Sequence, residues 1–209
     1  MSFTSKKLAE AYDQIADDYH RDHAKDTWDN DFLEDFSGRL AKGSTVLDLG
    51  CGPGIESEKL VKKGFHVTGF DISENLLKIA HEKAPEAAFI HGDMLEPLPF
   101  SSGQFDALFA KASLLHVPKA KIEPVLREIA RVTKNGGIIH IAVKKGHGEE
   151  EVAENDYGYE YKRWFSFWQP EELEAKFAAA DLDIIEKGVW QNPGRKTIWL
   201  KYILKKRES

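Results

Sequence analysis

Apolar residues recur along this chain with two different periods. In the first forty residues they return every three or four positions, which predicts two amphipathic helices. The apolar positions of the first helix are Leu8, Tyr12, Ile15, Ala16 and Tyr19, and those of the second are Trp28, Phe32, Phe36 and Leu40. Beyond these helices, short apolar runs alternate with further helical stretches. This alternation is typical of a parallel sheet with helices on both faces.

The central part of the chain divides into expected strands and helices. Strands are expected at 46–49, 65–70, 88–91, 107–110 and 138–143. Helices are expected at 55–63, 74–83, 120–133 and 171–180. The helix at 120–133 has the clearest apolar face, and we expect Gly136 and Gly137 to stop it.

Two more apolar runs, at 182–189 and 197–204, flank the triplet Asn192-Pro193-Gly194. This triplet is a turn signal, so the two runs are expected to pair as an antiparallel hairpin. Together with the five central strands they predict an α/β fold. Its sheet would have seven mostly parallel strands, with an antiparallel strand in the C-terminal hairpin.

Composition narrows the class of protein further. With 209 residues and 42% hydrophobic content, one domain with one core is expected. The net charge of −6 argues against binding to nucleic acid, which needs clustered basic side chains. The chain has a single cysteine, a start without the apolar core of a signal peptide, and no apolar run of about 20 residues. These features predict a cytoplasmic protein that does not contact membranes.

The loop after the first expected strand carries the strongest chemical signal. The segment 46–54 reads Val-Leu-Asp-Leu-Gly-Cys-Gly-Pro-Gly, and alternate glycines let backbone N–H groups approach a nucleotide. A dinucleotide fingerprint would need glycine at position 55, where Ile55 stands. Asp71 ends the next strand, where an acidic residue accepts hydrogen bonds from ribose hydroxyls. Loop and carboxylate together predict an adenosine-type ligand.

Five segments follow one another in the chain at the spacing of one domain. They are Asp48-Leu49-Gly50-Cys51-Gly52-Pro53-Gly54, Gly92-Asp93-Met94, Phe105-Asp106-Ala107-Leu108-Phe109, Leu114-Leu115-His116-Val117 and Arg131-Val132-Thr133-Lys134-Asn135-Gly136-Gly137. In this order they resemble the class I S-adenosylmethionine-dependent methyltransferases, and most closely the small bacterial enzymes that methylate small molecules. The resemblance covers most of the chain. The resemblance implies a Rossmann-like sheet and S-adenosylmethionine as cofactor.

The same resemblance implies a set of cofactor contacts. The glycine loop would cradle the methionyl part, Asp71 would hold the ribose, and Asp93 would accept from the adenine amine. Tyr12 and Tyr19, in a Tyr-Asp-x-x-Ala-x-x-Tyr segment, would approach the sulfonium. The full set is Tyr12, Tyr19, Asp48, Gly50, Cys51, Gly52, Gly54, Asp71, Ile72, Asp93, Met94, Ala110 and Lys111.

Other interpretations of these residues stay open. Asp71 and Asp93 can each serve as a turn or cap residue after a strand. Cys51 as a nucleophile is disfavoured, because no His and Asn pattern accompanies it. Methyl transfer depends chiefly on positioning, and a base is needed only when the acceptor must lose a proton. His116 is the candidate base or acceptor contact, with Tyr19 as a second catalytic candidate, although His116 can also simply support its loop.

The segment 144–169 is longer than a simple connection needs. It has an acidic run at 149–156, and seven of the twelve residues at 157–168 are aromatic. We expect a lid over the acceptor site, although the aromatic residues can also pack as ordinary core. Arg163 would pair either with an acceptor carboxylate or with a glutamate of the acidic run. The candidate substrate-binding residues are Lys145, Tyr159, Tyr161, Arg163, Trp164 and Trp168.

The sequence thus predicts one methyltransferase domain over 1–209. Its parts would be a helical cap at 1–42, a cofactor-binding core at 43–143, a lid at 144–169, and a C-terminal helix and hairpin at 170–209. The expected activity is methyl transfer from S-adenosylmethionine to a small molecule. The alternatives are a non-catalytic binder of the cofactor or a metabolite, and an NAD-dependent oxidoreductase. No metal is expected, because the chain has a single cysteine and therefore no cluster of cysteines at ligand spacing. No feature indicates an oligomeric state.

Overall fold

A computed structural model describes residues 3–25, 30–191 and 196–208, so Trp28 and the triplet 192–194 lie outside the described residues. The helices are α1 (Ser5–His23), α2 (Asn30–Ser37), α3 (Ile55–Lys62), α4 (Glu74–Lys83), α5 (Ile122–Val132) and α6 (Pro170–Ala179), with short 3₁₀ turns η1 (Leu114–His116) and η2 (Lys119–Lys121). The strands are β1 (Thr45–Leu49), β2 (His66–Asp71), β3 (Ala88–His91), β4 (Phe105–Lys111), β5 (Thr133–Lys144), β6 (Glu149–Glu154), β7 (Tyr161–Ser166), β8 (Leu182–Gln191) and β9 (Ile198–Lys206).

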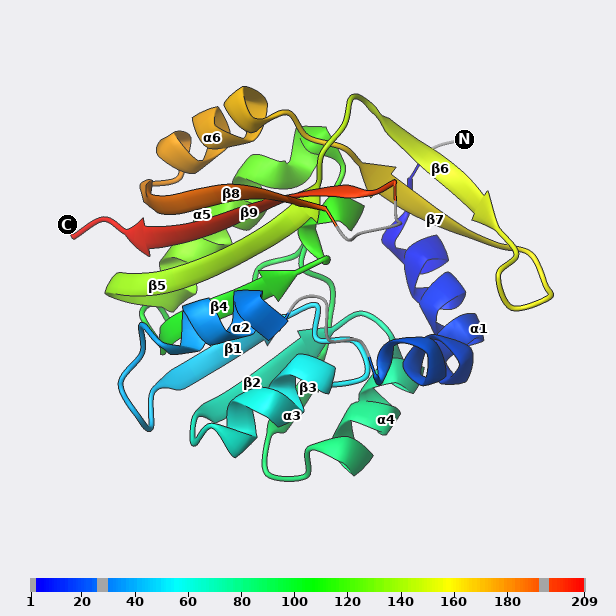
Figure 1. Cartoon of the computed structure of the whole chain (residues 1–209), viewed down its shortest axis with the longest axis horizontal. Coiled ribbons are helices and arrows are strands. Elements are labelled where there is room, and N and C mark those ends of the chain that lie inside the picture. The colour runs from blue at the N-terminus through cyan, green and yellow to red at the C-terminus, as the bar shows by residue number, and fades with distance from the viewer. Residues whose placement is uncertain (1–2, 26–29, 192–195, 209) are drawn as a thin grey trace.

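Seven of these strands form one twisted sheet in the order β3-β2-β1-β4-β5-β9-β8 (Figure 1). The strands from β3 to β5 are parallel neighbours, whereas β9 runs antiparallel to both β5 and β8. The expected α/β fold, with its mostly parallel Rossmann-like sheet and its antiparallel C-terminal hairpin strand, is therefore confirmed. Strand order reverses between β1 and β4, which is the place where ligands bind in open α/β sheets.

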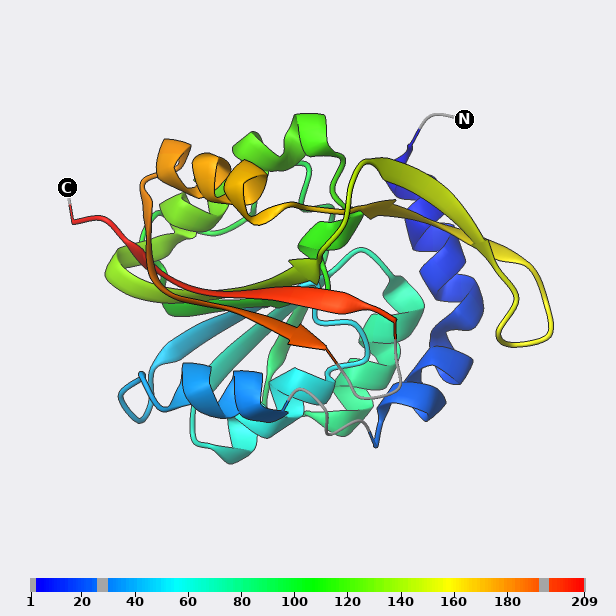
Figure 2. The ribbon, with the colours of Figure 1, turned by 45° about the horizontal axis from the view of Figure 1, so that its top comes forward.

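Helices cover both faces of the sheet (Figure 2). On one face, α2 and α3 pack with side chains from the central strands around Phe36, Leu60 and Phe109. On the other face, α5 and α6 close a larger core that contains Leu126 and Phe177. The parallel strands are buried on both sides, which is why they read as nearly continuous apolar runs.

Helix caps explain several boundaries. Ser73 precedes α4 and its hydroxyl accepts from the Leu76 N–H at 3.1 Å, so the helix begins where the sequence expects it. The glycine stop after 120–133 is wrong. Helix α5 ends at Val132, and the chain passes directly into β5, so that Gly136 and Gly137 lie within the strand. A Cβ at Gly137 would approach the Asp106 carbonyl to 2.8 Å, so close packing of two strands requires glycine there.

The segment between β5 and α6 forms a second, two-stranded antiparallel sheet, β6 and β7. The acidic run at 149–156 supplies β6. The hairpin leans against α1, beyond the end of the main sheet (Figure 1). Contacts between them include the Tyr159 hydroxyl, which donates to Asp18 Oδ2 at 2.6 Å. Helix α1 and the hairpin therefore cover the carboxyl ends of the main strands together.

Candidate active site

A cavity of about 750 Å³ opens beyond the carboxyl ends of the parallel strands, where strand order reverses. Its walls come from α1, from the loops after β1 to β4, and from the ends of β5, β7 and β9. This volume lies in the range of small-molecule and cofactor sites. Three of the five segments that carry the sequence resemblance, 48–54, 92–94 and 114–117, contribute residues to the cavity wall, whereas 105–109 and 131–137 do not.

The glycine loop after β1 lies under this cavity. Gly50 has a φ of +76°, and a Cβ there would lie 2.3 Å from the Ser113 Cβ, so the loop can pass only as glycine. Gly52 also has a positive φ, of +53°, but a Cβ there would meet no atom within 4 Å. Gly50, Cys51 and Gly52 line the cavity, so the loop exposes its backbone to a ligand.

Asp71 joins this loop to β2. Its Oδ2 accepts from the Gly52 N–H at 2.8 Å, and its Oδ1 accepts from the Ser73 N–H at 2.9 Å. Burial raises the pKa of Asp71, and the two backbone donors oppose that rise. Asp71 therefore has the turn-forming role, yet it also lines the cavity, and a carboxylate has lone pairs left for further donors. Its contact with ribose stays a prediction.

Three residues from the expected cofactor set do not line the cavity. Asp48 is buried inside the sheet, where it accepts from the Ser57 hydroxyl at 2.6 Å, and burial raises its pKa to about 7. A Cβ at Gly54 would meet the Ala80 Cβ at 2.9 Å, so this glycine lets the loop pack on α4. Ala110 is fully buried in the core beneath the site. Their contact with the cofactor stays a prediction.

The other residues of that set do line the cavity: Tyr12, Tyr19, Ile72, Asp93, Met94 and Lys111. Asp93 also accepts from the Leu95 N–H at 2.9 Å, as a cap residue would. Lys111 donates to Glu56 Oε1 at 2.6 Å, and both side chains are largely buried. Burial alone would raise the pKa of Glu56, but the Lys111 ammonium outweighs it and the pKa lies below its usual value. Such a pair beside the glycine loop complements a ligand with both an ammonium and a carboxylate.

Ser113 is a cavity residue that the sequence interpretation missed. Its buried hydroxyl has no hydrogen-bond partner in the described structure. The preceding Ala112 has a φ of +55°, a conformation that is rare for a residue other than glycine. No sequence pattern predicts a positive φ at an alanine, so the sequence does not indicate that Ser113 lines the cavity.

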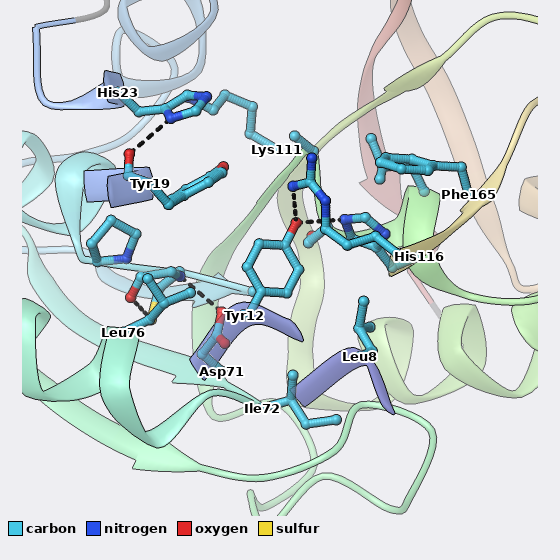
Figure 3. Close-up of a pocket in the computed structure, with 18 of the residues that line it drawn as sticks. Leu8, Tyr12, Tyr19, His23, Asp71, Ile72, Leu76, Lys111, His116 and Phe165 are labelled. Carbon is cyan, nitrogen blue, oxygen red and sulfur yellow. Dashed lines mark hydrogen bonds between the residues drawn. The ribbon is translucent and has the colours of Figure 1, made fainter. Parts of the chain in front are cut away.

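A chain of hydrogen bonds crosses the middle of the cavity (Figure 3). His116 Nδ1 lies 2.5 Å from the Trp164 carbonyl oxygen, which can only accept, so Nδ1 carries the proton. Nε2 therefore accepts from the Tyr12 hydroxyl at 2.7 Å. Arg163 donates to the same Tyr12 oxygen at 3.1 Å, and it pairs with Glu154 through two bonds of 2.6 and 2.7 Å. Arg163 thus has a partner from the acidic run.

The imidazole of His116 in this hydrogen-bond chain is neutral. Burial first, and then the positive charges of Arg163 and Lys144, lower the pKa of His116 to about 3. Burial likewise raises the pKa of the Tyr12 phenol. Because Nε2 is occupied by Tyr12, His116 meets the cavity contents through that hydroxyl. A role of His116 as a base would therefore have to pass through Tyr12.

The cavity has two halves. In Figure 3, Tyr12 lies between a group with Asp71 and Ile72 and a group with His116 and Phe165. The first half contains the glycine loop and the ends of β2 and β4.

We call the side with His116 and Phe165 the second half. The Lys144 ammonium and the Arg163 guanidinium both lie over the Phe165 ring, and Arg163 also lies over the Tyr161 ring. Trp199, the register neighbour of Lys144, and Trp190, which pairs with Trp199, line the cavity too.

Only two of the six expected substrate residues, Tyr161 and Arg163, line that second half. The expectation is corrected for Trp168, which is fully buried in the core because it packs with the strands and α6. It is also corrected for Trp164, which packs edge-on against Phe3 on the other side of β7. Tyr159 is held by Asp18 on α1.

Lys145, the fourth residue corrected in this way, does not line the cavity, whereas the adjacent Lys144 does. Successive side chains of an extended segment point to opposite sides, which separates these two lysines.

In the part of the chain that the structure describes, no three His, Cys, Asp or Glu side chains are grouped as a metal site. Within the same residues, no helix combines the length and apolar character of a membrane span.

Comparisons with known proteins agree with this arrangement. Residues 46–137 match the family described as a methyltransferase domain. A demethylmenaquinone methyltransferase from Listeria welshimeri is 42% identical over 108 residues, which are 47% of this chain and 44% of that protein. The chain spans about half the length of the curated relatives it matches.

Two solved structures show the same fold over the whole chain. One is a 1,6-didemethyltoxoflavin-N1-methyltransferase from Burkholderia thailandensis with bound 1,6-didemethyltoxoflavin and S-adenosylhomocysteine. Its TM-score is 0.77 at 16% identity, and the match covers 100% of this chain and 92% of that one. The other is the [4+2]-cyclase SpnF, with a TM-score of 0.79 at 17% identity, covering 100% and 98%. Residues 46–137 thus match a methyltransferase domain, and the chain has the class I fold of the S-adenosylmethionine-dependent methyltransferases.

Proposed function

We propose that this protein transfers a methyl group from S-adenosylmethionine to a small-molecule acceptor. The observation that carries the proposal is the two-part cavity. One half holds the glycine loop and Asp71, the other is walled by aromatic residues, and Tyr12 lies between them. Two ligands, one in each half, would lie next to each other beside Tyr12. Transfer of a group between two bound molecules requires this arrangement.

Two details of the first half fit the cofactor. The Ser113 hydroxyl is buried at the cavity without a partner in the described structure, so a ligand there would satisfy it. Above Gly52 there is space that a side chain would fill. The cofactor would supply an activated methyl group. Asp71 would accept from ribose hydroxyls, while Lys111 and Glu56 would hold the charged methionine end.

The remaining chemistry belongs to the acceptor half. Tyr12 and His116 would orient the acceptor and, if it must lose a proton, take that proton at Tyr12 Oη while His116 Nε2 receives the phenolic one. The aromatic walls would exclude water. A relative is named as a demethylmenaquinone methyltransferase and a protein of the same fold as a 1,6-didemethyltoxoflavin methyltransferase. Both names support a small molecule, and not a protein or nucleic acid, as the acceptor.

Fold alone does not decide the reaction, because the [4+2]-cyclase has the same fold. A binder without turnover is the second candidate. Isothermal titration with S-adenosylhomocysteine and with NAD separates the cofactor classes, and formation of S-adenosylhomocysteine with acceptors such as demethylmenaquinone tests turnover. Binding of NAD instead of S-adenosylhomocysteine would overturn the proposal.

The assignment of Asp71 is tested by Asp71→Asn and Asp71→Ala, with Asp183→Ala in the exposed strand β8 as the control. Loss of hydrogen bonds to an ionised group should lower affinity for S-adenosylhomocysteine about ten- to a hundredfold in the Asp71 variants. The control should bind normally. Circular dichroism confirms that each variant is folded. Unchanged affinity in folded Asp71→Ala would refute the assignment.

A further inference from the structure

Lys144 is the last residue of β5, and its side chain lines the acceptor half of the cavity. Two lysines and one arginine line the cavity in the described structure: Lys111, Lys144 and Arg163. Lys111 pairs with Glu56 and Arg163 pairs with Glu154, whereas Lys144 has no carboxylate within 4 Å among the described residues. Lys144 therefore presents an ammonium group that lacks an ion-pair partner of opposite charge.

The surroundings of Lys144 make this charge costly. Burial, and then the nearby positive charge of Arg163, lower the pKa of Lys144 to about 8, and Glu154 only partly opposes them. His116 on η1 also lies within electrostatic range and is neutral. A bound anion would offset the desolvation of the ammonium, because opposite charge favours the protonated form.

Aromatic side chains surround the same ammonium group. Its Nζ lies 3.8 Å from the centre of the Phe165 ring. Trp199 on β9 is the register neighbour of Lys144 and lines the cavity, as does Tyr161 on β7. Aromatic walls accept a flat molecule through stacking and edge contacts. The cavity thus combines flat apolar walls with one cation that no carboxylate neutralises.

We propose that Lys144 binds the carboxylate of a flat aromatic acid, and that such acids are the acceptor class of this protein. That these acids are methyl acceptors rests on the proposed function, whereas the binding of a carboxylate by Lys144 does not. Arg163, which the sequence would pair either with an acceptor carboxylate or with a glutamate of the acidic run, is held by Glu154 and Tyr12. Lys144 is accordingly the residue that selects an anionic ligand.

The test compares two probes of nearly the same shape, anionic 2-naphthoate and neutral 2-naphthamide. Titrations use wild type, Lys144→Met and the neighbouring Lys145→Met, each with and without saturating S-adenosylhomocysteine. Methionine keeps the length and apolar stem of lysine. We expect wild type and Lys145→Met to prefer 2-naphthoate by about tenfold or more, and Lys144→Met to bind both probes alike.

The pH dependence gives a second readout. Above pH 8 the free Lys144 loses its proton, so the preference of wild type for 2-naphthoate should shrink between pH 7 and pH 9.5. Lys144→Met should show no such trend. Lys144→Gln, with melting temperatures for all variants, replaces Lys144→Met if that protein does not fold.

The outcomes separate this inference from the proposed function. Equal affinity for the two probes in wild type, or an unchanged preference in folded Lys144→Met, would overturn the role of Lys144. Failure of S-adenosylhomocysteine to bind would count against methyl transfer, while the titrations without it would still decide whether Lys144 selects an anion.

Discussion

At the scale of single residues, the hydroxyl groups of Tyr12 and Ser113 in the cavity differ in their hydrogen bonding. Tyr12 Oη bonds both His116 and Arg163, so it is satisfied before any ligand arrives. Ser113 Oγ is buried and has no partner in the described structure. A substitution of Ser113 therefore tests ligand contact more directly than one of Tyr12, because it breaks no hydrogen bond within the described protein.

Ser113→Ala should therefore weaken cofactor binding without weakening the fold. We expect about a three- to tenfold loss of affinity for S-adenosylhomocysteine, the size of one ordinary hydrogen bond, and a melting temperature equal to wild type or higher. Calorimetry and thermal unfolding measure the two quantities.

Ser44→Ala is the matched control for Ser113→Ala. The Ser44 hydroxyl donates to the Ala41 carbonyl at 2.7 Å, at the start of β1 and away from the cavity. It should show the reverse result, with lower stability and normal affinity. If Ser113→Ala behaves like Ser44→Ala, the hydroxyl has no ligand role.

Sequence predicts residue types near the site better than it predicts their side. Two pairs of neighbours show this: Lys144 and Phe165 line the cavity, whereas the candidates Lys145 and Trp164 beside them do not. An alternating segment places neighbours on opposite sides, but only packing against α1 and β9 decides which side faces the cavity.

At the scale of elements, one carboxylate of α1 binds the start of α4. Asp13 accepts from the Ser73 hydroxyl at 2.6 Å and from the Asn75 N–H at 3.0 Å, both at the N-terminal end of α4. A carboxylate is favourable at that end of a helix. The helix that supplies Tyr12 and Tyr19 to the cavity is thereby held at the start of α4.

Asp13→Ala should loosen α1 as a unit. Loss of both hydrogen bonds should lower the free energy of unfolding by about 2 kcal/mol, speed amide exchange throughout α1, and weaken S-adenosylhomocysteine binding. Asp17→Ala, at an exposed position of the same helix, is the control and should leave all three unchanged. Exchange in α1 that is equally slow in both variants would show that Asp13 does not dock the helix.

Elements with a clear period and a cap were predictable. The bounds of α4 and β3 agree with the sequence at both ends, and Ser73 explains the start of α4. The strand β6 was not predicted, because a run of acidic residues has no apolar alternation of its own. It becomes a strand only by pairing with β7. Whether the β6–β7 hairpin moves as a lid stays a prediction.

At the scale of the whole molecule, buried histidines set the response to acid. Burial is the largest cause that lowers the pKa of both His116 and His140 to about 3. An unfolded histidine has a pKa of about 6.5, so between these values the unfolded chain binds protons that the folded protein does not. Stability is therefore lost as pH falls below 6.5. Asp48, with its pKa raised by burial to about 7, acts in the opposite direction.

His140→Leu isolates one of these contributions. His140 is fully buried away from the cavity, stacked on Phe109 at 4.5 Å, and neither ring nitrogen has a partner in the described structure. Relative to wild type, the variant should gain about 1.4 kcal/mol per pH unit as pH falls from 6 to 4.5. Urea unfolding at several pH values measures this gain.

The control for His140→Leu is His66→Gln, a change at an exposed position. It should follow the wild-type curve. Parallel curves for wild type and His140→Leu would mean that the buried ring is not neutral.

The hydrogen bond between Tyr12 and Arg163 joins residues 151 positions apart, whereas Asp13 reaches Ser73 across only 60. Contacts between distant residues close large loops and form late in folding. During synthesis, α1 can dock on α4 once about two fifths of the chain has emerged, because α4 ends at Lys83 of 209 residues. The acceptor half gains its wall only after β7 has been made. We expect the nucleotide-binding half to be assembled, and able to take up its ligand, while the acceptor half is still open.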